Sequence, residues 1–409
     1  MAEDRLDIVL FGATGFTGGL TAEYLAAHAD PGTRWGLAGR SVARLEAVRA
    51  RLACSSPACV SLPLLVADVD DPMSIRAVAE AARVVITTVG PYAEFGEPLV
   101  AACAAAGCDY VDLTGEPEFV DRMYLKYDAL ATSTGARIVH SCGFDSIPHE
   151  LGALWTVSQL PDDVPIALSA YVMARGAVSG GTIRSAVGVM ARLRQAATAA
   201  GERRAVEGEQ TVPPGRRVRL MAGRPHREEL AGGYVMPMPT LDPLHVLRSA
   251  RRLPGYGPDF SYSHYLVAGG LPATMALAGG AGLATVLAQL GPSRSLLLRF
   301  GTAGSGPSAQ RRARSWFRVR MVAKTPTGRL ITEVSGGDPG YGETAKMLAE
   351  SALCLAFDEL PEPSGPRGGQ LTPAVAIGQP LIDRLIRAGI RFEVVESGTQ
   401  SDAFPAAVA

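Results

Sequence analysis

Three glycines near the start of the chain are spaced for close contact with a phosphate group. In "RLDIVLFGATGFTGG" (5–19), a mostly apolar run leads into Gly12, Gly15 and Gly18. The first glycine permits a tight turn, the second lets a pyrophosphate approach the backbone, and the third lets a helix lie against a sheet. The loop is completed by Ala13, Thr14, Phe16 and Thr17. Its free N–H groups and the helix dipole predict a dinucleotide site.

The residues after the second expected strand indicate which dinucleotide binds. An NAD site places an acidic residue there, about 20 residues beyond the glycines, to hold the ribose 2′-hydroxyl. This chain instead reads "AGRS", with Arg40 and Ser41 and no carboxylate. A guanidinium can pair with a 2′-phosphate through two hydrogen bonds, and the serine adds a hydroxyl donor. The sequence therefore predicts NADPH as the cofactor.

Two further strand ends are expected to line the cofactor crevice, because ligands of open α/β sheets bind outside the carboxyl ends of the strands. Asp68 follows the third strand, where it either faces the adenine or caps the next turn. The loop "TTVGPY" (87–92) follows the fourth strand and should face the ribose and nicotinamide. Its predicted cofactor contacts are Thr88, Val89, Gly90 and Pro91.

The end of the sixth expected strand is where substrate and cofactor would meet. "HSCGFDSIPHELG" (140–152) offers Asp145, which either caps the following helix or donates a proton, and we place Gly143 and Phe144 in the substrate site. Tyr92 is the second candidate proton donor. The segment also holds Cys142, Ser146, His149 and Glu150.

A second glycine-rich turn, "SGGT" (179–182), follows an expected strand in the second half of the chain. The N–H groups at Gly180, Gly181 and Thr182 could hold a substrate carboxylate, thioester oxygen or phosphate, with Arg184 one turn further on. The alternative is a plain turn in which the threonine caps a helix.

The elements that carry these residues alternate regularly over the first third of the chain. Six short apolar segments, interpreted as strands, lie between helical segments, which predicts a doubly wound parallel sheet of the Rossmann type over residues 1–150. We expect a second α/β domain with a mixed sheet over 151–350. A helix and strand over 351–395 could return to the first domain, and 396–409 would form a flexible tail.

The composition limits the class of protein. The 409 residues carry a net charge of −1 and 47% hydrophobic residues, which favours a globular protein and argues against a nucleic-acid partner. The six cysteines form no CxxC pair and no zinc-site spacing, so no metal is expected. Since the first residues lack the layout of a secretory signal, we expect a cytoplasmic protein.

One uncharged segment complicates that expectation. Residues 265–290, "YLVAGGLPATMALAGGAGLATVLAQL", are long enough to span a bilayer but rich in glycine and alanine. The segment forms a helical hairpin buried in the protein, lies on a membrane surface at the inner face of the plasma membrane, or spans the bilayer.

Motifs along nearly the whole chain resemble the saccharopine-dehydrogenase-like oxidoreductases, and in particular the mycobacterial trans-acting enoyl reductases. The motifs are "GATGFTG", "WGLAGRS", "TTVGPY", "YVDLTGE", "CGFDSIP", "SGGT", "DPGYGETAKMLAESAL" and "LTPAVAIG". The resemblance implies a Rossmann domain, NADPH, and a role beside a polyketide synthase in wall-lipid synthesis. The chain departs from the common pattern at His149 and Glu150, which follow "CGFDSIP" where that pattern has Ser-Asp.

Three functions remain open at this point. In the first, a hydride from NADPH reduces an enoyl thioester on an acyl carrier, and the arginine-rich stretch 184–230, with ten arginines against five glutamates, meets the carrier. The second is an imine or carbonyl reductase of a small carboxylate, which Arg175 and Arg184 would bind. The third is a lipid-surface protein that keeps the cofactor fold without turnover.

Overall fold

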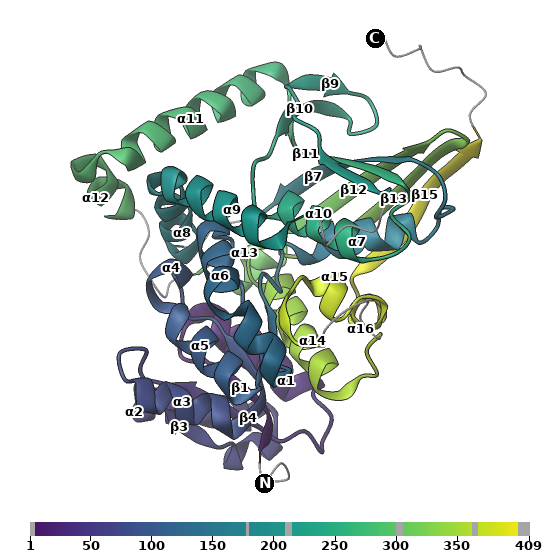
Figure 1. Ribbon diagram of the computed structural model, residues 1–409. Helices are drawn as coiled ribbons and strands as arrows, with labels where there is room; N and C mark the ends of the chain where they lie inside the picture. Colours follow the sequence, from purple (N-terminus) through teal and green to yellow (C-terminus); the bar gives the residue numbers. More distant parts are fainter. Residues whose placement is uncertain (1–4, 177–179, 209–214, 300–305, 362–366, 400–409) are drawn as a thin grey trace.

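The computed structural model describes residues 5–176, 180–208, 215–299, 306–361 and 367–399, arranged around two β-sheets (Figure 1). The first sheet has seven parallel strands in the order β14-β6-β5-β4-β1-β2-β3, and the second has eight strands of mixed direction. Both the Rossmann sheet and the second mixed sheet that the sequence predicted are therefore confirmed.

Strands and helices alternate in the first domain. In chain order the elements are β1 (Leu6–Phe11), α1 (Phe16–His28), β2 (Trp35–Gly39), α2 (Val42–Ser55), β3 (Leu64–Val66), α3 (Pro72–Ala81), β4 (Ala82–Thr87), α4 (Tyr92–Phe95), α5 (Glu97–Ala106), β5 (Asp109–Val111), α6 (Pro117–Thr134) and β6 (Arg137–Val139). Right-handed βαβ connections place the six strands in the 3-2-1-4-5-6 order of dinucleotide-binding folds. Their carboxyl ends consequently share one edge of the sheet.

The middle of the chain builds most of the second sheet. Its elements are α7 (Ile147–Val157), β7 (Ile166–Arg175), α8 (Gly180–Ala191), α9 (Leu193–Glu207), β8 (Arg217–Leu220), β9 (His226–Glu228), β10 (Gly233–Pro237), α10 (Asp242–Arg252), β11 (Asp259–Gly269), α11 (Leu271–Gln289), α12 (Gly291–Arg299), α13 (Ala309–Arg312), β12 (Trp316–Thr325) and β13 (Gly328–Gly336). Helix α7 packs against β12 and β13, and α10 packs against α7 and β11. One face of this sheet is thereby covered.

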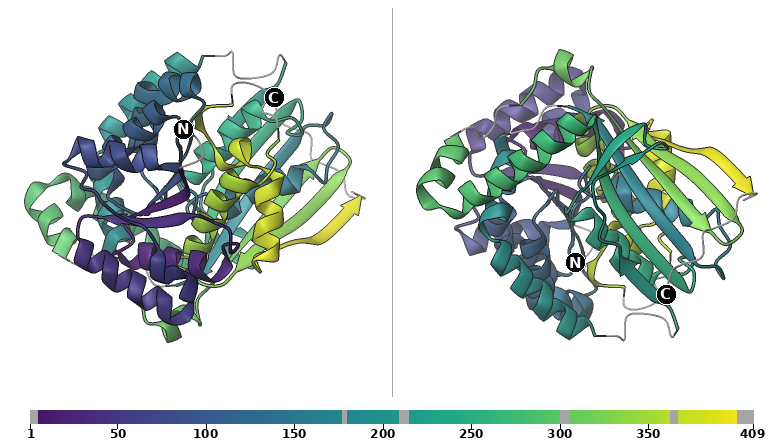
Figure 2. Two further views of the ribbon diagram at one scale, coloured as in Figure 1. Left: turned by 90° about the horizontal axis from the view of Figure 1, so that it is seen from below. Right: turned by 90° about the horizontal axis from the view of Figure 1, so that it is seen from above.

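The last elements join both sheets. They are α14 (Gly342–Phe357), β14 (Gly369–Leu371), α15 (Pro373–Ala376), α16 (Gln379–Arg387) and β15 (Arg391–Thr399). Strand β14 extends the first sheet beside β6, whereas β15 pairs with β13 in the second. Helix α14 is buried along almost its whole length and packs on α1 and β4. The chain end thus ties the two sheets together, and the views of Figure 2 show them side by side.

Two boundaries differ from the sequence prediction. Residues 396–399, expected in the tail, belong to β15 through its pairing with β13, and 400–409 lie outside the described residues. The expected hairpin at 265–290 is also wrong: residues 265–269 complete β11, and α11 is a single helix of 19 residues. Among the described residues, α11 is the one helix with the length and composition to cross a membrane, and only 11% of its apolar window is buried.

Candidate active site

The glycine loop between β1 and α1 has the geometry of a phosphate cradle. Gly12 has φ +90°, and a Cβ there would lie 2.8 Å from Thr88 Oγ1 and Val89 Cγ2. A Cβ at Gly18 would lie 2.2 Å from the Gly12 carbonyl oxygen, so neither position accepts a side chain. A Cβ at Gly15 would meet that same oxygen at 3.4 Å and no other atom of the described residues within 4 Å. The space beside Gly15 is therefore open on the side where a pyrophosphate would lie.

The rest of the loop fits the same ligand. Gly15 is the N-cap of α1 and makes no side-chain cap, so the first N–H groups of the helix, in the turn that begins with Phe16 and Thr17, have no intrahelical acceptor. Ala13 is buried and Thr14 is exposed at the loop tip. These donors and the positive end of the helix dipole suit a diphosphate.

The strand ends beside β1 carry the adenosine-side residues. Arg40 is exposed directly after β2, free to meet a 2′-phosphate. Ser41 caps α2 by accepting a hydrogen bond from the Arg44 N–H at 3.4 Å, and its hydroxyl hydrogen can still be donated. Asp68 Oδ1 accepts the N–H of Asp70 at 3.2 Å, so the residue caps the turn, and its contact with the adenine stays a prediction.

The loop after β4 closes over the glycine loop. The Thr88 hydroxyl donates to the Gly12 carbonyl at 3.2 Å, which joins the two loops directly. Val89 is half-buried beside Gly12, and Gly90 is exposed with Pro91 buried behind it. This places the predicted "TTVGPY" contacts next to the phosphate cradle.

Tyr92 is not placed to donate a proton, which corrects its predicted catalytic role. The buried hydroxyl donates to the Thr87 carbonyl at 3.1 Å and accepts the Leu113 N–H at 3.2 Å. Burial, together with the nearby Asp112 carboxylate, raises the pKa of Tyr92 well above its ordinary value. Both hydrogen-bonding functions of the hydroxyl are occupied inside the protein, so Tyr92 holds the β4 and β5 ends together.

Glu116 holds the β4 loop in place. It is the last residue of the motif "YVDLTGE" and was not among the predicted site residues. Its buried carboxylate accepts the backbone N–H groups of Tyr92 and Ala93, each at 3.0 Å. It also accepts the Ser185 hydroxyl at 2.9 Å and lies 3.4 Å from Arg192. Glu116 therefore connects the cofactor loop to α8 and the segment after it.

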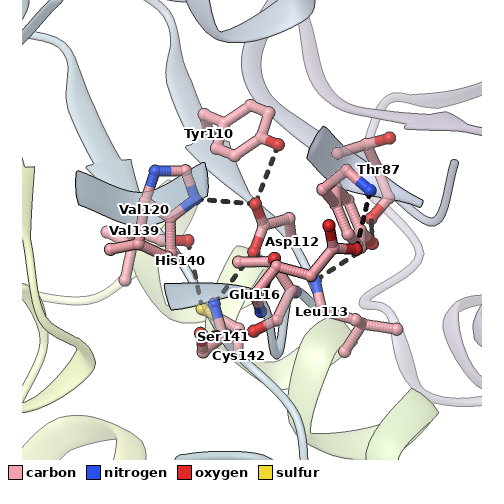
Figure 3. A network of polar contacts seen from close by, with 12 residues as sticks. Thr87, Tyr110, Asp112, Leu113, Glu116, Val120, Val139, His140, Ser141 and Cys142 are labelled. Atoms are coloured by element: carbon pink, nitrogen blue, oxygen red, sulfur yellow. Dashed lines mark hydrogen bonds and ion pairs between the residues drawn. The ribbon is translucent and has the colours of Figure 1, made fainter. Parts of the chain in front are cut away.

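A buried network around Asp112 fixes the chain as it leaves β6 (Figure 3). Asp112 accepts hydrogen bonds from the Tyr110 hydroxyl at 2.9 Å and the Ser141 N–H at 2.9 Å, and contacts His140 Nδ1 at 2.7 Å. Ser141 has φ +65°, a conformation unfavourable for a residue with a side chain, and its hydroxyl donates to the Thr114 carbonyl at 2.6 Å. The network thus holds a strained turn at the entry to 143–145.

Gly143 and Phe144 are locked by α14. A Cβ at Gly143 would lie 2.6 Å from Leu113 Cδ2 and 3.1 Å from Thr344 Cγ2, so only glycine fits. The Phe144 N–H donates to the Thr344 hydroxyl at 3.1 Å, and the Phe144 ring packs edge-on against His149. The backbone before Asp145 is therefore rigid.

Asp145 is the acid that this turn presents. Helix α7 begins at Ile147 with Ser146 as its N-cap, so Asp145 does not cap it and the capping alternative is wrong. Its side chain reaches solvent, yet the surrounding protein atoms and, next, the Asp242 carboxylate raise the pKa of Asp145 to about 7. The group can therefore hold a proton and release it near neutral pH.

Behind Asp145 lies a buried polar cluster that joins α7, α10 and β11. Asp242 Oδ1 lies 3.5 Å from His149 Nε2, and Asp242 Oδ2 lies 3.9 Å from His264 Nε2. The Tyr262 hydroxyl contacts His264 Nδ1 at 2.9 Å. Because burial lowers the pKa of His149 to about 3 and that of His264 to about 4, both imidazoles are neutral at pH 7. Burial also raises the pKa of Asp242 above its ordinary value. Where Asp242 is ionised, no charged histidine among the described residues compensates it, and its field disfavours the charged form of Asp145.

The predicted anion turn lies at the start of α8. Gly180, Gly181 and Thr182 form the first turn of this helix, while the residue before them lies outside the described residues. Arg184 is half-buried one turn further on. The hydrogen bond from Ser185 to Glu116 places this helix beside the β4 loop.

A second polar site lies at the edge of the first sheet, where β6 and β14 end. A cavity of about 30 Å³ is bordered by Arg203, Arg248, Arg251, Arg252, Glu207, His140 and His245. Both ring nitrogens of the buried His245 and Nη1 of Arg248 have no hydrogen-bond partner among the residues that the structure describes. Asp121 lies 3.2 Å from Arg203 and also contacts Arg248. The cavity is therefore polar and rich in arginine.

Comparisons with known proteins agree with this geometry. Residues 8–139 match the family described as saccharopine dehydrogenase NADP binding domain. The chain is 40% identical to the protein named "Putative trans-acting enoyl reductase" of Mycobacterium tuberculosis H37Rv, over 95% of this chain and 97% of that protein. It is 35% identical to the trans-acting enoyl reductase of Mycobacterium ulcerans, again over 95% and 97% of the two chains.

A solved structure supports the fold. Apo saccharopine dehydrogenase (L-Glu forming) from Saccharomyces cerevisiae superposes with a TM-score of 0.50 at 14% identity, covering 96% of this chain and all of that chain. Together with the glycine cradle and the absence of a carboxylate after β2, the matched domain identifies NADPH as the cofactor. The chain belongs to the saccharopine-dehydrogenase-like family of trans-acting enoyl reductases, and it is an NADP-dependent oxidoreductase.

Proposed function

We propose that this chain reduces the carbon–carbon double bond of an enoyl thioester that an acyl carrier protein presents during lipid synthesis. The relatives named trans-acting enoyl reductases support the reaction class. The observation that carries the assignment is Asp145, an accessible acid with a pKa of about 7 at the carboxyl edge of the cofactor-binding sheet.

The reaction needs a hydride at the β-carbon and a proton at the α-carbon. NADPH, when bound, supplies the hydride. Asp145, about half protonated at pH 7, gives its proton to the α-carbon as the enolate collapses, and water restores it. The N–H groups proposed to face the enolate oxygen are those of the first turn of α8 or that of Gly143. In this proposal Asp145 acts on the α-carbon and the backbone N–H groups act on the enolate oxygen.

The carrier protein and its polyketide synthase are the proposed partners. The stretch 184–230 carries ten arginines against five glutamates, and Arg194, Arg204, Arg224 and Arg227 are among its exposed arginines. Its described parts include α8, whose Ser185 bonds Glu116, the residue that holds the cofactor loop. Acidic carrier proteins are attracted to such a surface, and the attraction weakens as salt rises. A carrier bound there would present its acyl group beside Asp145.

The arginine-lined cavity supports one alternative, reduction of an imine or carbonyl in a small carboxylate. Arg248, with one unpartnered nitrogen, could hold such a carboxylate beside His245.

Stopped-flow loss of NADPH absorbance separates the two functions. We expect turnover with a carrier-bound enoyl substrate, and an Arg248→Gln variant should retain it. Turnover only with small free acids, abolished in that variant, would favour the alternative. Turnover with neither substrate class would favour a lipid-surface protein that binds NADPH without catalysis.

A further inference from the structure

The outward side of α11 is apolar, whereas the solvent-exposed side of a helix is normally polar or charged. Its buried residues are Thr274 and Ala288. The large side chains that are about half or more exposed are Leu271, Met275, Leu283 and Val286. At 3.6 residues per turn these four fall within an arc of about 120° on the side away from the buried pair. No residue between Tyr265 and Leu290 is charged.

The connections of α11 decide how it can meet a membrane. The helix follows β11, and the chain returns in β12, which lies in the same sheet with β7 between them. A single crossing would place these strands on opposite sides of the bilayer. The nine residues of α12 reach about 14 Å, too short to cross a hydrocarbon core of about 30 Å again. The connections of α11 are therefore those of a helix that lies on one side of a bilayer, and they do not fit a single crossing.

Cationic residues flank both ends of the apolar helix. Strand pairing aligns Arg227 with Tyr234, and Tyr234 with Gly269, the last residue of β11 before the helix. Arg294 lies exposed on α12 at the other end. Residues 180–330 hold 22 Arg or Lys but seven Asp or Glu, whereas the whole chain has 39 against 40. Arg203 and Arg248 belong to this excess but are turned inward, whereas the exposed Arg227 and Arg294 can meet the phosphate groups of an anionic lipid surface.

We propose that α11 and α12 embed in one leaflet of an anionic membrane, with the outward apolar arc among the acyl chains and the flanking arginines at the headgroups. Figure 1 shows α11 along the outer edge of the molecule with α12 at its far end; α11 contacts β10, β11 and α8 on its inner side. The embedded helix keeps the enzyme at the surface where lipid intermediates accumulate. This attachment does not depend on which substrate the active site takes.

Vesicle flotation of the full chain with bound NADPH tests the proposal. We expect the protein to float with vesicles of phosphatidylcholine and phosphatidylglycerol, less with phosphatidylcholine alone, and less in 1 M salt. The double variant Met275→Glu/Val286→Glu should lower the floating fraction at least tenfold. Met73→Glu, at a side chain 72% exposed on α3, is the matched control and should float like the wild type.

Several outcomes would overturn the proposal. Failure of the wild type to float with either vesicle, or flotation of the double variant, excludes lipid as the occupant. Loss of dimers in the double variant, measured without lipid, would assign the apolar arc to a second copy of the chain. Retention in the membrane pellet after alkaline carbonate would show a spanning segment. NADPH binding, measured in parallel, should be equal in all variants and shows that they are folded.

Discussion

The glycine loop after β1 and the turn after β6 lie at the same edge of one sheet but are built in different ways. The loop is made of backbone groups from residues 12–18, and its shape follows from where side chains are missing. The turn depends on side chains from distant parts of the chain: Asp145 precedes α7, Asp242 opens α10, and His264 lies on β11. The glycine loop is thus formed by residues adjacent in the sequence, whereas the turn at Asp145 is formed by residues that only the tertiary structure brings together.

The difference explains which chemistry each region can perform. Backbone N–H groups at a helix start bind a diphosphate whatever surrounds them, because the donors and the dipole belong to the helix itself. An acid with a pKa near 7 needs burial and a like charge, which only neighbouring elements can provide. Substitutions in the two regions should therefore fail in different ways.

The largest expected effect is that of Asp145→Asn. The amide cannot donate a proton as an acid, so kcat should fall by about 10²- to 10⁴-fold with NADPH affinity unchanged. In the wild type the acid form is active, so kcat should decrease as pH rises through about 7, and the variant should lose this dependence. The control is Asp163→Asn, on an exposed loop. An unchanged pH profile in Asp145→Asn would assign the proton to another group.

Next in size is the contrast between two glycines of the loop. Gly15→Ala should fold with an unchanged thermal midpoint, since its Cβ has room, but should lose about tenfold or more in NADPH affinity because the methyl group meets the pyrophosphate. Gly18→Ala should instead be unstable, because its Cβ meets the Gly12 carbonyl at 2.2 Å. Gly19→Ala, which meets the movable end of Arg51, serves as the control. Calorimetry would contradict the pyrophosphate assignment if Gly15→Ala bound NADPH normally.

Arg40→Ala tests the choice of cofactor. Loss of a charge-assisted contact worth about 1.5–3 kcal/mol should raise the Kd for NADPH by about 10- to 100-fold and leave the Kd for NADH unchanged. Arg44→Ala, exposed on α2 four residues after Arg40, should change neither. An equal rise in the Kd for NADPH and for NADH would mean that Arg40 does not bind the 2′-phosphate.

Asp242→Asn tests whether a residue distant in the sequence sets the pKa of Asp145. Removing the second carboxylate removes the like charge that raises the pKa of Asp145, so the midpoint of the kcat–pH profile should move to lower pH. At pH 7 the rate should fall moderately because less Asp145 is protonated. A profile that stays in place would show that burial alone sets the pKa.

The smallest catalytic effect is expected for Tyr92→Phe. Its hydroxyl bonds only to Thr87 and Leu113, so the free energy of unfolding should fall by about 1–3 kcal/mol, measured by urea denaturation. The kcat of the folded fraction and its pH profile should not change. A large loss of kcat at full stability would restore Tyr92 as a proton donor.

The first six strands could be predicted from the sequence because each is a short apolar run between helical segments. Strand β14 could not, since "GQL" has no periodicity and becomes a strand by pairing with β6. The exposure of α11 to solvent could not be predicted either, because an apolar sequence is equally compatible with a buried helix and with a helix on the surface.

In the site, the glycines, Arg40 and Asp145 could be placed from the sequence because each follows an expected strand, and the roles of Arg40 and Asp145 stay predictions. Asp242 carried no signal, since "LDPLHV" reads as an ordinary helix start. Tyr92 was misjudged because its environment is set by Thr87 and Leu113 across two strands.

The amino-acid sequence alone determined the cofactor cradle, because glycine spacing constrains backbone conformation within a few residues. Tertiary structure decided which acid holds a proton near neutral pH, and left the apolar face of α11 outside the protein. The physical reason is range: backbone geometry is fixed by neighbours in the chain, whereas burial and electrostatic fields are fixed by neighbours in space.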